Sequence, residues 1–139
     1  MSYFINPVKE DLCVYLTYEG DLSMIEIMSV KYEANALLIA KRWNRIVVDI
    51  TGLRSRFAAQ ELFEFAKGLS ADLPESVRIA LVARPDQAQQ AKLIEGIARN
   101  DGLFLSFFLS VEAAISWAKG MNFHERMKPQ TMGNLVKAS

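Results

Sequence analysis

The sequence has almost none of the residues that build metal and redox sites. Its 139 residues include one cysteine, Cys13, and one histidine, His124. A single cysteine excludes an intrachain disulfide and a cysteine-based metal cage, and His124 has no second histidine or any cysteine near it. We therefore expect no metal and no cofactor. Cys13, within LCVYLTY, is expected to be a small buried strand residue instead of a reactive thiol.

An excess of charge and long apolar runs are also missing. Sixteen basic residues balance sixteen acidic ones, so no long-range field draws the protein to nucleic acid or to an anionic bilayer. The longest uncharged apolar run is far shorter than a membrane span, and the opening MSYFINPVKED lacks the pattern of a signal peptide. These features predict a cytoplasmic protein of bacterial type that does not bind nucleic acid. The 51% hydrophobic content fits a compact folded class.

Strand patterns and helix patterns alternate along the chain. Runs of β-branched and aromatic residues bounded by turn residues predict strands, and apolar residues at three-and-four spacing predict helices. Ser23 followed by Glu26 has the spacing of a capping box, which marks the start of the first helix. The predicted strands are 3–8, 12–18, 45–51, 77–83 and 103–109, and the predicted helices are 24–42, 58–69, 87–99 and 111–119.

The order of these elements predicts an α/β fold. It is β-β-α-β-α-β-α-β-α, and strands joined by a single helix run parallel because the connection crosses over with right-handed winding. The two opening strands form an antiparallel hairpin, with Pro7 placing the first of them at an edge of the sheet. The three later strands are expected to be buried by the crossover helices. We expect one domain, residues 1–120, with a mixed, mostly parallel sheet of about five strands and about four helices, followed by a C-terminal tail, residues 121–139.

Two segments leave alternatives open. Residues 36–40, ALLIA, are apolar nearly all round the first helix, with Ala40 counted in its core stripe. Either the sheet and the next helix cover this segment, or part of it meets a partner, which includes a second copy of the chain. The tail has no sustained period but contains methionines, Phe123 and Leu135. It is therefore either extended or docked on its own domain or on a neighbouring copy.

Four strings, in this order and spacing, resemble the STAS family of anti-sigma-factor antagonists, and especially its small stand-alone STAS-like members. They are YLTYEGDLS before the first helix, VVDITGL at the central strand, VRIALVA at the next strand, and FFLSVEAAISWAKG at the end. The resemblance spans residues 12–120. It implies a non-enzymatic regulatory module in which a partner kinase phosphorylates a serine at the start of the helix after the central strand.

The phosphorylation motif of that family is absent. Its usual Asp-Ser-Ser-Gly, aligned on VDITGL, falls on Phe57, Ala58, Ala59 and Gln60. Alanine has no oxygen that can accept a phosphoryl group, so we expect the standard switch not to operate at this position. The nearest hydroxyls are Ser55 and Thr51, and the use of Ser55 would require a shifted loop.

The candidate site lies where the central parallel strands end. Arg54 and Arg56 follow the strand 45–51, and Arg84 follows the strand 77–83, so the sheet brings them toward one edge. Arginine forks match phosphate and carboxylate oxygens, and the adjacent helix N-termini add positive partial charge. The alternative is that these are solvated loop arginines paired with Asp86 or Glu61. Within the strand, Asp49 is expected to accept amide hydrogen bonds instead of acting as a base. The predicted binding residues are Thr51, Arg54, Ser55, Arg56, Phe57 and Arg84.

Two functions follow from these observations. The first is a non-enzymatic STAS-like regulatory or interaction module with a protein partner, such as a kinase or another regulator. The second is a carrier or sensor of a small apolar, lipid-like anionic ligand. Its pocket would lie between the first helix and the helix after the central strand, with the arginines holding the head group. An enzyme would need a base or nucleophile pair that the sequence does not provide. The predicted pocket lining is Phe57, Leu62, Phe63 and residues 36–40.

Overall fold

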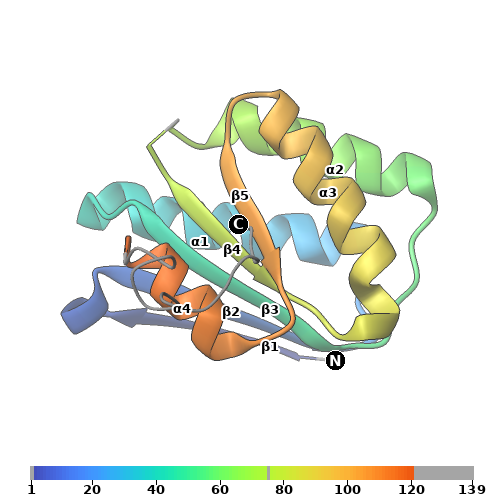
Figure 1. The fold of residues 1–139 in the computed structure, drawn as a ribbon, viewed down its shortest axis with the longest axis horizontal. Coiled ribbons are helices and arrows are strands. Elements are labelled where there is room, and N and C mark those ends of the chain that lie inside the picture. The colour runs from blue at the N-terminus through green and yellow to red at the C-terminus, as the bar shows by residue number, and fades with distance from the viewer. Residues whose placement is uncertain (1, 75, 121–139) are drawn as a thin grey trace, which may run out of the picture.

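The computed structural model describes residues 2–74 and 76–120 and arranges them in three layers (Figure 1). A five-stranded sheet in the order β1-β2-β3-β4-β5 separates α1, α2 and α3 on one face from α4 on the other. β1 pairs with β2 antiparallel, and the other pairs are parallel, which confirms the predicted mixed sheet. The strands are β1 (Ser2–Val8), β2 (Cys13–Gly20), β3 (Arg45–Leu53), β4 (Arg78–Val82) and β5 (Phe104–Phe108). The helices are α1 (Met24–Lys41), α2 (Ala59–Asp72), α3 (Ala88–Asn100) and α4 (Val111–Ala118).

Local signals place the first two strands and the first helix. A single 3-10 turn, Lys9–Asp11, closes the hairpin and ends at Leu12 in the left-handed conformation, with φ 52°. Before α1, Ser23 Oγ accepts a hydrogen bond from the Glu26 amide at 3.1 Å, and Glu26 Oε1 accepts one from the Ser23 amide at 2.7 Å. The predicted capping box is therefore confirmed, and Pro7 lies on the edge strand as expected.

Several boundaries differ from the predictions by one to three residues, and two of these differences have a clear physical reason. β3 continues two residues past Thr51 because Gly52 allows close approach to β2; an added Cβ would lie 3.0 Å from Glu19 Cγ and 3.2 Å from the Tyr18 carbonyl oxygen. Before α3, Pro85–Gln87 forms a 3-10 turn, so the helix begins at Ala88 and not at residue 87.

Burial corrects three sequence predictions. β5 is the second edge of the sheet, and Phe104 is 55% exposed, so the prediction that this strand is buried was wrong. Ala40, predicted in the core stripe of the first helix, is exposed, as is Ile39, whereas Leu38 is buried. The reason is that α1 is covered by the sheet and α2 along one side only. Ala58, expected in the core stripe of α2, is exposed at the start of that helix.

The core has two parts, one on each face of the sheet. The larger lies beneath α1, α2 and α3, and the smaller lies beneath α4, where Cys13, Val47, Ala80 and Ala114 are buried. Cys13 has no exposed surface, as predicted, and burial raises the pKa of its thiol to about 11. None of the helices formed by the described residues is both long and apolar enough to cross a membrane.

Candidate functional site

The predicted site is centred on the β3–α2 loop, residues 54–58, and on the last residues of β3. Asp49 Oδ1 accepts hydrogen bonds from the Thr51 amide at 2.8 Å and from Thr51 Oγ1 at 2.6 Å. The predicted structural role of Asp49 is therefore confirmed. The Thr51 hydroxyl, predicted as a binding group, is therefore engaged within the fold.

Ser55 attaches the β3–α2 loop to the residues before α1. Its Oγ accepts a hydrogen bond from the Leu22 amide at 2.6 Å and donates one to the Leu22 carbonyl at 2.7 Å. Both functions of the hydroxyl are therefore used within the fold. The sequence distance between the two residues, 33 positions, explains why no local pattern revealed this contact.

Arg84 supports the end of β3 with its guanidinium, although its side chain is still 37% exposed. Its Nη1 donates to the carbonyl of Thr51 and, at 3.2 Å, to the carbonyl of Leu53. Its Nε donates to Asp86 Oδ1 at 2.9 Å, the pairing that the sequence left as the alternative. The hydrogen bond from Arg84 holds the pKa of Asp86 below its usual value.

Gln87 is a supporting residue that the sequence did not indicate. Its Nε2 donates to the Ile50 carbonyl at 2.8 Å and to the Leu53 carbonyl at 3.1 Å, and the side chain is buried. The position of Gln87 beside a helix start gave no signal in the sequence. Its role depends on the tertiary packing that brings the start of α3 to the end of β3. Gln87 and Arg84 together satisfy the carbonyls at which β3 stops pairing.

Arg54 and Arg56 remain on the outside of this supported loop. Arg54 Nη2 lies 3.4 Å from Asp21 Oδ2, and both side chains are about two-thirds or more exposed, at 71% and 67%. An exposed pair of this kind contributes little to stability. Arg56 is also exposed, whereas Phe57 is half-buried and packs against the larger core. Of the three predicted arginines, two are therefore presented to solvent and one is used by the fold.

The start of α2 carries half of a capping box. Glu61 Oε1 accepts a hydrogen bond from the Ala58 amide at 3.0 Å, while Ala58 has no side-chain oxygen to cap the helix in return. Ala58 is exposed. This is the position at which the STAS resemblance expects the phosphoacceptor, and it is accessible but has no hydroxyl.

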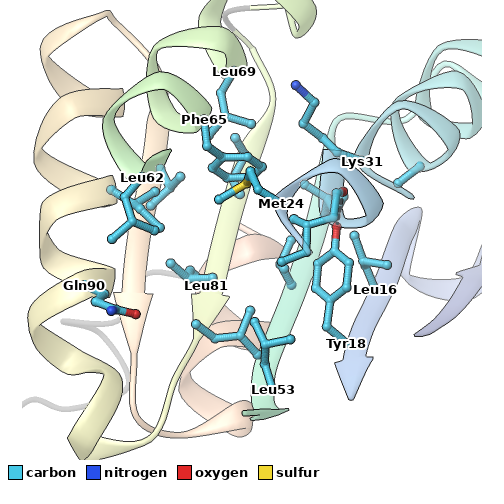
Figure 2. A pocket seen from close by; sticks show the side chains of 18 of the residues that line it. Leu16, Tyr18, Met24, Lys31, Leu53, Leu62, Phe65, Leu69, Leu81 and Gln90 are labelled. Atoms are coloured by element: carbon cyan, nitrogen blue, oxygen red, sulfur yellow. Dashed lines mark hydrogen bonds between the residues drawn. The ribbon is translucent and has the colours of Figure 1, made fainter. Parts of the chain in front are cut away.

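A cavity of about 90 Å³ lies between the sheet and α1, α2 and α3 (Figure 2). Leu62, Phe65 and Leu69 approach it from α2, and Met24 approaches it from α1. Of the predicted lining, Phe57 and Leu62 are correct. Phe63 and residues 36–40 were wrong: Phe63 is 46% exposed and faces a surface hollow shared with α3, and the 36–40 segment does not line the cavity.

Two polar residues of α1 border this cavity and were missed from the sequence. Lys31 and Asn35 are each only 5% exposed. Lys31 Nζ lies 2.6 Å from Asp72 Oδ2 of α2, while Asn35 Nδ2 is buried with no hydrogen-bond partner among the described residues. An unpaired buried amide is costly, so the mostly apolar wall of the cavity contains one unsatisfied polar group.

Comparison with known proteins identifies the fold. No family model matches the sequence, and no curated protein matches it. The structure is similar to an anti-sigma factor antagonist from Mycobacterium paratuberculosis, with a TM-score of 0.59 and 13% identity over 85% of this chain and 95% of the other. It is also similar to an uncharacterized protein from the DUF3478 family with a SpoIIAA-like fold, from Shewanella loihica PV-4. There the TM-score is 0.55 and the identity 14%, over 84% of this chain and 92% of the other.

These likenesses establish the class of fold. The chain has the STAS-like α/β fold that its sequence strings resemble, and the predicted fold class is confirmed. Within residues 2–74 and 76–120, no group of three or more His, Cys, Asp and Glu side chains is placed to hold a metal ion.

Proposed function

We propose that the protein is a non-enzymatic STAS-like regulatory module that binds a protein partner through its β3–α2 loop. The observation that carries this proposal is that some polar side chains at the loop stabilise its backbone while others are exposed and available for binding. Ser55 and Arg84 hold the backbone, while Arg54 and Arg56 point to solvent with little use in the fold. A preorganised loop loses less conformational entropy on binding than a mobile one.

The chemistry of the loop favours an acidic partner surface. Two exposed arginines can form bidentate hydrogen bonds with carboxylates, and Phe57 lies beside them at the border of the core. Charges at the rim of an interface mainly set the rate of association and the salt dependence of binding. We therefore expect the affinity for the partner to fall as the ionic strength rises.

This module would work without phosphorylation of the loop. Ala58 offers no acceptor oxygen, and both functions of the Ser55 hydroxyl are engaged with Leu22. A kinase would have to break both Ser55 hydrogen bonds and displace the loop before transfer. The partner is therefore better described as an acidic regulator than as a kinase that uses this serine as its substrate.

The test is a comparison of two double variants of equal charge. In Arg54→Glu/Arg56→Glu the proposed surface is reversed, and in Lys9→Glu/Lys92→Glu two exposed lysines elsewhere are reversed. Quantitative cross-linking in host lysate should identify a partner that the wild type and the lysine variant share and that the arginine variant loses. Equal recovery with all three proteins would refute the proposal.

The cavity supports a second candidate function, a carrier of a small apolar ligand. At about 90 Å³ it is smaller than the roughly 150 Å³ of an engineered cavity that admits benzene. An acyl chain would therefore enter only if α2 moved away from α1. The unpaired Asn35 amide supplies a donor for one polar ligand atom.

The carrier function can be tested by filling the cavity. Ala34 borders it and has no exposed surface, whereas Ala36 is exposed on the same helix. Native mass spectrometry of protein from host lysate, followed by denaturation, should detect a retained amphiphile in the wild type and in Ala36→Leu but not in Ala34→Leu. A bare mass for all three proteins would count against a carrier.

A further inference from the structure

Two arginines lie side by side at the opposite end of the strands, where β3 and β4 begin. Arg45 and Arg78 are partners in the parallel register of these strands, and both are half-buried. Neighbouring strands are about 4.8 Å apart, so two like charges in register on one face repel each other unless something compensates them. Neither the STAS resemblance nor the proposed partner loop accounts for this pair.

Each arginine donates a hydrogen bond to a different neighbouring segment, Arg78 to the end of α4 and Arg45 to the hairpin turn. Arg78 Nη1 donates to the Trp117 carbonyl at 2.8 Å, and Arg45 Nη1 donates to the Asp11 carbonyl at 2.9 Å. Lys119 Nζ, two residues after Trp117, lies 3.1 Å from Asp11 Oδ1. The Arg45–Arg78 cluster therefore consists of these five residues, from the hairpin turn, β3, β4 and the end of α4.

The cluster has three positive charges and one negative charge. The Asp11 carboxylate is already engaged, because it accepts a hydrogen bond from Tyr15 Oη at 2.7 Å and contacts Lys119. Among the described residues, Arg45 and Arg78 contact backbone carbonyls and no carboxylate. Each guanidinium has five N–H groups, so most of the donors of both forks have no partner among residues 2–74 and 76–120.

Two aromatic rings lie beside the Arg78 guanidinium. The guanidinium carbon lies 5.0 Å from the centroid of the Trp117 ring and 6.0 Å from that of Phe104. Contacts of this kind orient a guanidinium through its face and leave its N–H edge for an oxyanion. The hydrogen bond to the last turn of α4 uses one N–H and is compatible with a ligand on the others.

We propose that the Arg45–Arg78 cluster is a binding site for a phosphate group. A tetrahedral phosphate has enough acceptor oxygens to bridge two guanidinium forks and the Lys119 ammonium at once, and its charge removes the repulsion between the arginines. The phosphate belongs either to a free phosphate ester or to the head group of a phospholipid.

The test uses the fluorescence of Trp117 as a reporter. The chain has two tryptophans, so Trp43→Phe leaves Trp117 alone against Arg78. This background is titrated with inorganic phosphate, with glycerol 3-phosphate, and with phosphatidylcholine vesicles with and without phosphatidic acid. Saturable change with the soluble phosphates indicates a free ester as the source, and change only with phosphatidic acid vesicles indicates a head group; either outcome supports the site.

Matched variants separate this site from the partner loop. Arg45→Gln removes one fork and should weaken the response about tenfold or more, the usual loss for a charged hydrogen-bonding group. Arg54→Gln removes an arginine from the β3–α2 loop and should leave the response unchanged. Circular dichroism and thermal melting confirm that both variants are folded. The absence of a saturable response to any probe, or equal affinity in Arg45→Gln and Arg54→Gln, would overturn the proposal.

Discussion

The ammonium nitrogen of Lys31 lies 2.6 Å from Oδ2 of Asp72 and joins α1 to α2. The Lys31 side chain is 6% exposed and that of Asp72 25%. Lys31 also lies 4.4 Å from the Tyr32 ring centroid and 5.7 Å from that of Phe65. Lys31 borders the cavity, so a movement of α2 away from α1 at Asp72 would break this ion pair.

Asp72→Asn should destabilise the protein. The substitution leaves the buried Lys31 ammonium without its carboxylate, and breaking a buried pair in this way typically costs about 3–5 kcal/mol. Because Asp72 is a quarter exposed, we expect a loss of about 3 kcal/mol in the free energy of unfolding, measured by urea denaturation. Asp21→Asn is the control, since it weakens the exposed pair with Arg54 and should cost less than about 1 kcal/mol. Equal losses would show that the Lys31–Asp72 contact is not stabilising.

Ala58→Ser should stabilise α2. The Glu61 half of the capping box is already present, and a serine hydroxyl would supply the missing acceptor. The expected gain is about 1 kcal/mol in the free energy of unfolding, the usual value of an N-cap. Ala59→Ser, one residue into the helix, is the control and should give no gain. Thermal denaturation of the two variants checks the prediction, and a gain of equal size in both would contradict it.

Arg84→Ala and Arg56→Ala should differ sharply in stability. The first leaves the carbonyls of Thr51 and Leu53 without their guanidinium donor, and we expect a loss of about 1–3 kcal/mol. The second removes an exposed side chain and should change the free energy of unfolding by less than about 0.5 kcal/mol. Guanidinium chloride denaturation of both variants measures these two changes in the free energy of unfolding. If Arg56→Ala proved the more damaging, the supporting role given to Arg84 would be wrong.

Cys13 should be unreactive in the native protein. Its thiol has no exposed surface, and burial raises its pKa from 9.0 to about 11, so little thiolate forms at pH 8. Ellman's reagent should label it only after denaturation. Rapid labelling of the native protein would contradict the burial of this strand residue.

The same pKa shift predicts a loss of stability at alkaline pH. The unfolded thiol loses its proton near pH 9 while the folded thiol keeps it to about pH 11, so the folded state binds more protons in this interval. The contribution of the protonated Cys13 thiol to the free energy of unfolding is therefore fully present below pH 9, and it is lost as the pH rises toward 11. Cys13→Ala should show a shallower decline of the melting temperature between these pH values. Burial also raises the pKa of Tyr15 and Tyr18, so these two tyrosines contribute to the decline that remains.

The secondary structure was predictable because its signals are local. The capping box of Ser23 and Glu26, the apolar run of β3 and the breaks at Gly20 and Asn100–Gly102 act over a few residues. The order of elements, together with the right-handed crossover, was enough to predict the mixed sheet. The candidate site was predicted only in part: the β3–α2 loop was located, and Arg54 and Arg56 lie exposed on it.

The sequence by itself therefore determined the elements, their order and the class of fold. Only the tertiary structure decided which side chains are available. Arg84 turns inward to the end of β3, Ser55 bonds to Leu22, Lys31 and Asn35 are buried at a cavity, and Arg45 meets Arg78. Each of these contacts joins residues that are far apart in the chain or depends on which strand lies next to which. Helical and strand periods record only which face of an element is apolar, so they do not contain that information.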